Sequence, residues 1–320
     1  MEYFLKKYRI ELLVITGLTV LLFLVIFINS RVEHLEEVVD SENITEVGFE
    51  NITQEDGPLT AISYDLPQRL SFAGEEVPLD RSDLREQIDQ ELQINIYFHS
   101  NTIFLIKRAN KWLPQFESIL ERNGIPDDFK YLPLIESGLL NVVSPANAVG
   151  FWQIVKSAGK ENGLEISNEV DQRYDPIKAA EAACKYFKKA YEKFGNWTLV
   201  AASYNRGVSG MDKAIKKQKV DSYYDLFLNE ETSRYVFRIL AIKEIIENPE
   251  RYGFKINPKH LYQQDSIRYV EVSRTIPDLV DFSLEQGTNY KLLKRYNPWL
   301  RDDRLTVKRN ETYTIALPAI

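Results

Sequence analysis

The sequence predicts a mainly α-helical protein with a small β-α-α-β module at its C-terminal end. Residues 82–254 show apolar positions at helical spacing and little strand-like alternation. After Pro258, two β-branched runs, Tyr269–Val272 and Thr312–Leu317, flank two short helical patterns. Leu12–Ile28 is uncharged, almost wholly apolar and long enough to cross about 30 Å of hydrocarbon as a helix. A helical domain, a small α/β module and one membrane span are therefore expected.

The charges around the apolar segment predict its orientation. Lys6, Lys7 and Arg9 precede it, whereas acidic residues dominate after Arg31. We therefore expect residues 1–30 to be a cytoplasmic stub and a single-pass anchor in the inner membrane, with the remainder in the periplasm or outside. A cleaved signal peptide is the alternative, but the apolar run is long and no small-x-small cleavage pattern follows it.

Most of the net charge of −7 lies in one acidic segment. Residues 31–60 hold nine acidic residues and one arginine, which leaves the remainder close to neutral. Because this stretch is unpatterned and poor in aromatics, we assign residues 31–66 to a flexible acidic linker. The remainder lacks the basic excess typical of nucleic-acid binders, so no nucleic-acid partner is expected.

The cysteine and histidine content argues against disulfides and metals. Cys184 is the only cysteine, so no intramolecular disulfide is possible, and its alanine neighbours predict a small core residue. His34, His99 and His260 are far apart and have no cysteines at ligand spacing. We expect neither a metal nor a cofactor.

Capping signals predict the ends of several helices. From about Pro67 the periodicity turns helical, and Ser82 is the expected N-cap of the first clear helix. A second helix should end at Gly124, and a third should begin at Asp175 and end at Gly195. A last helix should stop near residues 248–249, an Asn-Pro pair. One face of the third helix is apolar: Ile177, Ala180, Cys184, Phe187 and Tyr191.

One carboxylate stands in an unusually apolar setting. Glu136 follows the run "YLPLI" at residues 131–135 and is followed by Ser137. Apolar surroundings raise the pKa of a carboxyl group, which suits a general acid that works near neutral pH. The neighbouring hydroxyl is placed to orient it. The alternative is a glutamate without a catalytic role that faces solvent from a helix.

Two further segments combine aromatic rings with amides. A loop after Glu136 leads to the sequence "GFWQ" at residues 150–153, and "AASYNRG" presents Tyr204 and Asn205 just before Gly207 breaks the helix. Rings pack on the apolar faces of sugars and amides bond hydroxyl and acetamido groups, so the pair suits a polysaccharide. Taken alone, a Tyr-Asn pair is more often core plus cap.

Four segments together resemble a known enzyme family. The segments "IESGLLNVVSPANAVGFWQI", "VDQRYDP", "AASYNRG" and "ETSRYVFRILA" have the order, and nearly the spacing, of lytic murein transglycosylases of the soluble-lytic-transglycosylase (SLT) type. Over roughly residues 85–254 the chain resembles this family, in particular its membrane-bound D subfamily. The C-terminal segments "IPDLVDFSLEQGTNYKLLKRYNPWL" and "ETYTIALP" resemble a LysM module. A structural appendix packed on the catalytic domain is the alternative to a peptidoglycan-binding module.

The resemblance implies a fold and an activity. It implies a lysozyme-like α-helical catalytic domain over residues 67–257 and a LysM-like peptidoglycan-binding module over residues 258–320. The implied reaction cleaves the MurNAc-GlcNAc β-1,4 bond of peptidoglycan without water and leaves 1,6-anhydroMurNAc ends, for cell-wall remodelling or turnover. The implied partners are peptidoglycan glycan strands and the membrane that holds the N-terminal helix.

The resemblance also implies roles for individual residues. Glu136 would be the single catalytic acid and base, and Ser137 would hold its carboxyl group. Asn147 stands where a glycine is usual, but Asn tolerates the left-handed conformation, so the turn should survive. The implied substrate-binding residues are Gly150, Phe151, Trp152, Gln153, Tyr204, Asn205 and Tyr235.

Two other functions stay open on the sequence. A lysozyme-type muramidase would need a second carboxylate to activate water, and Asp171 and Asp175 are candidates, although "VDQRYDP" is more typical of a structural turn and cap. A non-catalytic peptidoglycan-binding envelope protein is the other alternative. The joint presence of the site residues argues against a decayed site.

Overall fold

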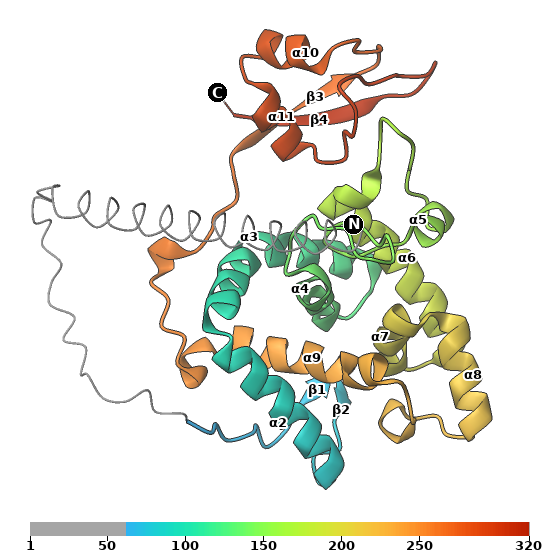
Figure 1. Ribbon diagram of the computed structural model, residues 1–320. Coiled ribbons are helices and arrows are strands. Elements are labelled where there is room, and N and C mark those ends of the chain that lie inside the picture. The colour runs from blue at the N-terminus through green and yellow to red at the C-terminus, as the bar shows by residue number, and fades with distance from the viewer. Residues whose placement is uncertain (1–61, 320) are drawn as a thin grey trace, which may run out of the picture. The chain divides into compact units, whose positions relative to one another are not determined.

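The computed structural model describes residues 62–319 (Figure 1). The expected membrane span, Leu12–Ile28, and nearly all of the expected linker at residues 31–66 lie outside this range. Within it, no helix combines the length and the apolar character needed to cross a bilayer. The described chain is mainly helical and ends in a small domain with two strands.

A short hairpin and a set of helices precede the small domain. The hairpin consists of β1 (Ser71–Phe72) and β2 (Glu75–Glu76). The α-helices that follow are α2 (Ser82–Tyr97), α3 (His99–Asn123), α4 (Leu132–Ser137), α5 (Lys156–Glu161), α6 (Pro176–Phe194), α7 (Trp197–Arg206), α8 (Val208–Gln218) and α9 (Glu230–Glu247). Single 3₁₀ turns are η1 (Asp127–Tyr131), η2 (Gln172–Tyr174), η3 (Tyr223–Asp225), η4 (Pro249–Tyr252) and η5 (Pro258–His260).

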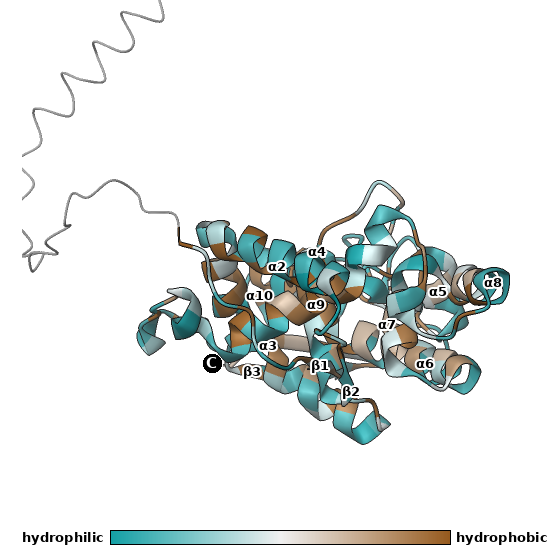
Figure 2. Cartoon of the chain, turned by 90° about the horizontal axis from the view of Figure 1, so that it is seen from below, coloured by the Kyte–Doolittle hydropathy of each residue, from teal (hydrophilic) through white to brown (hydrophobic). Residues whose placement is uncertain are grey.

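The helices share one core, and α9 lies at its centre. Helix α9 contacts α2, α4 and α7 and runs across the middle of the helical region in Figure 1. Its residues from Tyr235 to Ile242 are buried with the exception of Arg238, which is half-buried. Figure 2 shows both apolar and hydrophilic residues on the surrounding helices, as is typical of amphipathic helices around a common core. Helix α9 is therefore the element against which the site residues are positioned.

Most of the predicted helix ends are confirmed. Gly124 ends α3 with φ 66°, and Asn248 is the C-cap of α9. The Asp175 side chain accepts from the backbone N–H groups at the start of α6, which ends at Gly195. The expectation for Ser82 is wrong by one position, because Arg81 is the N-cap and its side chain makes no capping bond.

Two other expectations are corrected by the structure. Helical structure does not begin at Pro67, because the β1–β2 hairpin comes first; Ala73 and Gly74 turn it with φ of 53° and 80°. Strands of two residues are too short to show alternation in the sequence. In α6, Tyr191 lies at the surface and its ring stacks on Trp197 with centroids 4.0 Å apart, so it does not join the buried face.

The C-terminal domain has the predicted β-α-α-β order. Strand β3 (Ile267–Val272) pairs antiparallel with β4 (Tyr313–Pro318), from Ile267 opposite Pro318 to Val272 opposite Tyr313. Helices α10 (Leu279–Glu285) and α11 (Tyr290–Tyr296) lie between the strands in sequence and pack on each other. The buried residues of this domain form a second core: Val272, Ile276, Leu279, Leu293, Trp299, Leu300, Leu305, Ile315 and Leu317.

One residue of the helical region also belongs to this second core. Val170, in the segment between α5 and α6, is buried among its members and forms a bridge with Leu300. On either side, the Asp171 N–H donates to the Trp299 carbonyl at 2.9 Å and the Arg301 N–H donates to the Glu169 carbonyl at 2.8 Å. The segment before α6 and the C-terminal domain therefore share both apolar packing and backbone hydrogen bonds.

The cap of α6 yields a stability prediction. Asp175 accepts from the Ile177 and Lys178 N–H groups at 2.9 and 3.1 Å. Asp175→Ala should lower the free energy of unfolding by about 1 kcal/mol. The melting temperature should then fall by about 2–4 °C, as measured by differential scanning calorimetry. Asp175→Asn is the matched control, because Asn caps equally well; equal losses in both variants would contradict the capping role.

Candidate active site

The short helix α4 carries Glu136, and two arginines hold its C-terminal end. Arg238 on α9 donates from Nη2 to the Ile135 carbonyl at 3.0 Å, and Arg108 on α3 donates from Nε to the Gly138 carbonyl at 2.6 Å. Gly138 ends the helix with φ 61°. The last carbonyls of a helix lack partners within the helix, and cations are favourable there. The position of Glu136 is therefore fixed from two neighbouring helices.

The Glu136 carboxyl group lies against α9 with one hydrogen-bond donor. The hydroxyl of buried Tyr235 donates to Glu136 Oε1 at 2.5 Å. Burial raises the pKa of Glu136 from 4.5 to about 7, and nearby Glu231 adds to the rise, whereas the Tyr235 bond and the charge of Arg238 oppose it. Burial disfavours the charged carboxylate, while a donated hydrogen bond and a positive charge favour it. At neutral pH both protonation states are populated, so this group can both give and take a proton.

The Ser137 hydroxyl does not hold this carboxyl group, contrary to expectation. Ser137 Oγ lies 2.8 Å from the Phe151 carbonyl and 3.1 Å from the Pro133 carbonyl. One step along the helix turns the hydroxyl away from the Glu136 side chain, toward the turn at residues 150–153. Ser137 therefore joins α4 to that turn, and the bond to Glu136 comes from Tyr235.

Gly150 is required at its position by its close approach to another backbone segment. Its φ is 82°, and a Cβ there would lie 2.0 Å from the Arg173 carbonyl oxygen. The preceding loop turns at Asn147 with φ 59°, which confirms the expected left-handed conformation. No side chain other than hydrogen fits at residue 150 without moving one of the two segments.

A buried ion pair supports the same loop. Arg173 Nη2 lies 2.7 Å from Asp171 Oδ2, and Arg173 Nη1 donates at 3.2 Å to the carbonyls of Asn147 and Ile154. Asp171 and Asp175, the candidate second carboxylates, are thus both engaged, the first by Arg173 and the second as a helix cap. In this structure both residues stabilise the local backbone, as the interpretation of "VDQRYDP" as a turn and cap predicts.

The structure places two of the expected substrate-binding rings in the core. Phe151 is 5% exposed and Trp152 is fully buried, where it packs against Phe116 with centroids 5.3 Å apart. Their rings are therefore not available to a substrate here, because the apolar interior already covers them. Their carbonyls serve the site instead: that of Phe151 accepts from Ser137, and that of Trp152 accepts from the Tyr204 hydroxyl at 2.7 Å.

Gln153 and Asn205 use their amides to bind neighbouring protein groups. Gln153 donates from Nε2 to the Gly150 carbonyl at 2.8 Å and to the Val142 carbonyl at 3.1 Å, which ties the loop together. Asn205 donates to Glu231 Oε1 at 2.8 Å and accepts from Thr232 Oγ1 at 2.8 Å. Asn205 is thereby linked to the start of α9, while Tyr235 further along α9 reaches Glu136.

Glu231, Arg238 and Arg108 belong to the site but were not predicted from the sequence. Glu231 and Arg238 stand at i−4 and i+3 from Tyr235, which was predicted, so the three share one face of α9. That spacing is visible in "ETSRYVFRILA" and could have indicated Glu231 and Arg238. Arg108 lies far away in the sequence, in a plain amphipathic helix, and no local pattern distinguishes it.

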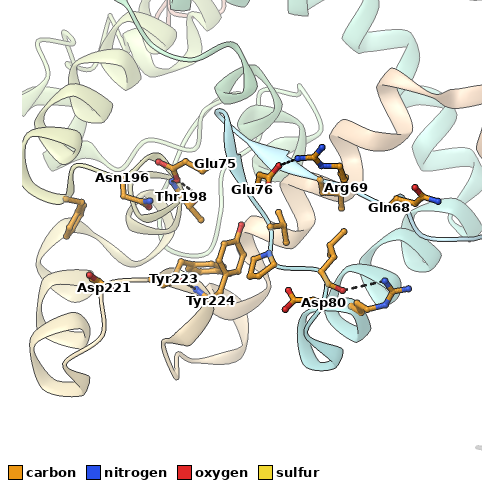
Figure 3. A pocket seen from close by; sticks show the side chains of 17 residues that line it. Gln68, Arg69, Glu75, Glu76, Asp80, Asn196, Thr198, Asp221, Tyr223 and Tyr224 are labelled. Carbon is orange, nitrogen blue, oxygen red and sulfur yellow. Dashed lines mark hydrogen bonds and ion pairs between the residues drawn. The ribbon is translucent and has the colours of Figure 1, made fainter.

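A small polar cavity adjoins Glu136. It has a volume of about 260 Å³, and Glu136, Ser137, Arg108 and Arg238 are among its lining residues. A larger cavity of about 840 Å³ lies elsewhere, beside the β1–β2 hairpin, and holds none of these residues (Figure 3). There Glu75 accepts from the Trp197 and Thr198 N–H groups and caps α7. We place the candidate site at Glu136, because this acid lines the cavity and burial raises its pKa to about 7. Among residues 62–319, no group of three or more His, Cys, Asp or Glu side chains is arranged to hold a metal ion.

Residues 116–227 match the family described as the transglycosylase SLT domain. This part of the chain is therefore similar to SLT domains. The match confirms the predicted resemblance and spans the site residues from Glu136 to Asn205, while Tyr235 lies after it. Residues 268–320 match the soluble lytic transglycosylase C-terminal LysM-like domain, which follows the SLT domain here.

Curated relatives agree with this assignment. The chain is 31% identical over 195 residues to the membrane-bound lytic murein transglycosylase D of Escherichia coli strain K12, and equally so to that of strain CFT073; the match covers 58% of this chain and 42% of each relative. A putative tributyltin chloride resistance protein of Alteromonas sp. strain M-1 is 29% identical over 126 residues, 39% of this chain and 61% of that protein. The chain thus spans less than half of the length of the E. coli relatives it matches.

The hydrogen bond between Tyr235 and Glu136 yields a prediction about the proton affinity of Glu136. Because this bond lowers the pKa of Glu136, Tyr235→Phe should raise that pKa above about 7. The measurement is a pH titration of the carboxyl carbon of Glu136 by ¹³C NMR. Tyr131→Phe is the matched control, since this buried tyrosine also donates to a glutamate, Glu247, at another place. A pKa that falls or stays constant in Tyr235→Phe would contradict this account.

The close approach at residue 150 yields a second prediction. Gly150→Ala should cost on the order of 3 kcal/mol or more of unfolding free energy, because backbone strain and a clash with the Arg173 carbonyl add together. Gly195→Ala has a similar φ of 61° but nothing within 4 Å, so its cost should be only about 1–2 kcal/mol. Urea denaturation of both variants measures the difference. Equal losses would mean that the backbone contact is unimportant.

Proposed function

We propose that this chain is a lytic transglycosylase that cleaves the MurNAc-GlcNAc β-1,4 bond of peptidoglycan and leaves 1,6-anhydroMurNAc ends. The observation that carries the proposal is a single half-buried acid, Glu136, which lies in the segment that matches the SLT domain and has a pKa of about 7 and one hydroxyl donor, Tyr235. The names of the E. coli relatives support the same activity. A water-activating second carboxylate is not needed for this reaction.

The proposed reaction uses Glu136 twice. Protonated Glu136 gives its proton to the leaving oxygen of GlcNAc while the acetamido oxygen of MurNAc attacks the anomeric carbon, so the glycosidic bond breaks and an oxazolinium ring forms. The Glu136 carboxylate then takes the proton of the MurNAc 6-hydroxyl, whose oxygen attacks the anomeric carbon and reopens that ring. The proton given in the first step is recovered in the second, and no water is consumed.

The surrounding groups suit both steps. The Tyr235 hydroxyl donates to the carboxylate form and so stabilises Glu136 after it has lost its proton. Asn205 uses one N–H for Glu231, and an amide has two, so the second is available for the substrate's acetamido group. The Tyr204 hydroxyl donates to the Trp152 carbonyl, and burial and the nearby Glu136 charge raise the pKa of Tyr204. We assign substrate binding to Tyr204, Asn205 and Gln153, and to the backbone of the turn at residues 150–152.

The muramidase alternative finds less support. Its candidate second carboxylates are used elsewhere, because Asp171 pairs with buried Arg173 and Asp175 caps α6. Glu231 is the acid that influences Glu136, and it accepts the bond from Asn205. The non-catalytic alternative is disfavoured by the raised pKa of Glu136, which a wall-binding surface does not require.

The domain layout that we propose is that of a wall enzyme anchored to the membrane. Residues 1–30 would anchor the chain in the inner membrane, residues 31–66 would link it, residues 67–257 would form the catalytic domain and residues 258–320 the LysM-like module. The description of the E. coli relatives as membrane-bound supports the anchor. The catalytic domain would then act in the periplasm on cell-wall remodelling or turnover, with the C-terminal module as a second contact to glycan.

The test compares the full-length chain with Glu136→Gln on purified peptidoglycan. Mass spectrometry of the released fragments should find anhydromuramoyl ends for the native chain and a loss of at least about 10²-fold for the variant. Glu121→Gln, an exposed glutamate on α3, is the matched control and should retain activity. Reducing ends that carry one added water would instead establish a muramidase. Binding without release by either protein would establish a non-catalytic wall-binding protein.

A further inference from the structure

The cavity beside Glu136 contains two guanidinium groups. Its wall is built from α2, α3, α4 and α9, and the polar side chains that line it are Asn95, Asn101, Arg108, Glu136, Ser137 and Arg238. At about 260 Å³ it exceeds the roughly 30 Å³ share of one water several times, so it has room for a small substituent. It is therefore a polar cavity next to Glu136, with more space than the Glu136 side chain itself occupies.

Both arginines keep most of their donors unused. Arg108 donates once, to the Gly138 carbonyl, and Arg238 donates once, to the Ile135 carbonyl. A guanidinium carries five N–H donors, so four remain on each. Within residues 62–319 neither one forms an ion pair with a carboxylate, whereas Arg173 pairs with Asp171 and Arg234 pairs with Glu91.

The cavity is therefore electropositive. Burial lowers the pKa of Arg108, which shows that its charge is partly withdrawn from water. Glu136 is the only acid that lines the cavity. Two positive charges thus face at most one negative charge. Partly buried charges are normally paired, so the balance favours an anionic ligand.

We propose that Arg108 and Arg238 form a subsite for a carboxylate carried by the 3-O-lactyl substituent of the muramoyl residue. The inference rests on the proposed function. This substituent is what distinguishes MurNAc from GlcNAc, and it is attached to the sugar ring whose anomeric carbon must reach Glu136. Its carboxylate comes from one of two sources: the lactyl group itself in stem-free glycan, or the peptide stem that is linked through that group.

The side chains that line this cavity are suited to bind a carboxylate. The planar guanidinium binds carboxylates through parallel N–H donors, with more geometric specificity than an ammonium. Asn95 donates to the Glu91 carbonyl and keeps its own side-chain oxygen and one N–H, which can bond a lactyl or peptide group. A chitin-like strand without lactyl groups would leave both arginines without a counter-ion. The subsite would therefore select muramoyl residues at the cleaved bond.

A purely structural role for the arginines makes a different prediction. If they only hold the α4 carbonyls, their loss would impair all substrates equally, because Glu136 itself would be misplaced. If they also bind a carboxylate, their loss would impair substrates that carry one more than substrates that lack one. The ratio of kcat/KM between the two kinds of substrate separates the two roles.

The experiment uses three glycans and the full-length chain: intact peptidoglycan strands with stems, stem-free strands with free lactyl carboxylates, and stem-free strands with these carboxylates amidated. Arg108→Gln and Arg238→Gln should each lower kcat/KM on the preferred carboxylate-bearing glycan by about 10- to 100-fold more than on the amidated glycan, where only the loss of the α4 contacts acts. Arg122→Gln, on α3 but paired with Glu181, is the matched control and should change neither. Arg238→Lys should restore part of the loss.

The outcomes separate the sources and the two proposals. A loss on stem-free glycan assigns the carboxylate to the lactyl group, and a loss confined to intact strands assigns it to the stem. An equal loss on all three glycans would overturn the subsite. If the native chain yields no anhydro ends, the proposed function fails, and calorimetry of Glu136→Gln with the three glycans still tests the subsite: equal affinity for all three would refute it.

Discussion

The buried ion pair between Asp171 and Arg173 is the interaction on which the rest of the site depends. The Arg173 guanidinium binds Asp171 and the carbonyls of Asn147 and Ile154, and the Arg173 carbonyl fills the space where Gly150 lacks a side chain. The loop from residue 147 to 154 is thus folded around one side chain. A buried ion pair of this kind adds little net stability. It does fix one arrangement of the loop, because separating the pair would leave a buried charge without a partner.

The acid itself is balanced by opposing effects on α9. Burial favours neutral Glu136, and Glu231 reinforces this, whereas Tyr235 and Arg238 favour the carboxylate. All three partners lie on one face of α9, so one helix supplies every group that modifies the effect of burial on the proton affinity of Glu136. An acid that must both give and take a proton needs such a compromise, because a strong preference for either form would slow one of the two steps.

The sequence could predict what is encoded locally. Helix ends at Gly124, Asp175 and Asn248 follow from capping chemistry, and the left-handed turn at Asn147 follows from the tolerance of asparagine for positive φ. The apolar run before Glu136 correctly predicts a raised pKa, because burial is the first cause of the rise.

Features that depend on tertiary contacts could not be predicted in this way. The direction of the Ser137 hydroxyl depends on where the Phe151 carbonyl lies, which sequence spacing does not specify. The rings at residues 151 and 152 were expected at the substrate because aromatics bind sugars, but an aromatic residue serves an apolar core equally well. Arg108 reaches the site from a distant helix, and two-residue strands such as β1 leave no periodicity to detect.

The sharing of Val170 between the two parts of the chain has a consequence for the order in which the protein is made. The ribosome synthesises Val170 about 130 residues before its bridge partner Leu300, so the helical domain emerges with this apolar residue and the neighbouring Glu169 and Asp171 backbone groups uncovered. These groups can contact their partners only after residues 299–301 have been synthesised. A chain whose synthesis stops early would therefore expose this apolar residue and these unpaired backbone groups next to Arg173. Quality-control proteases and chaperones can recognise such groups.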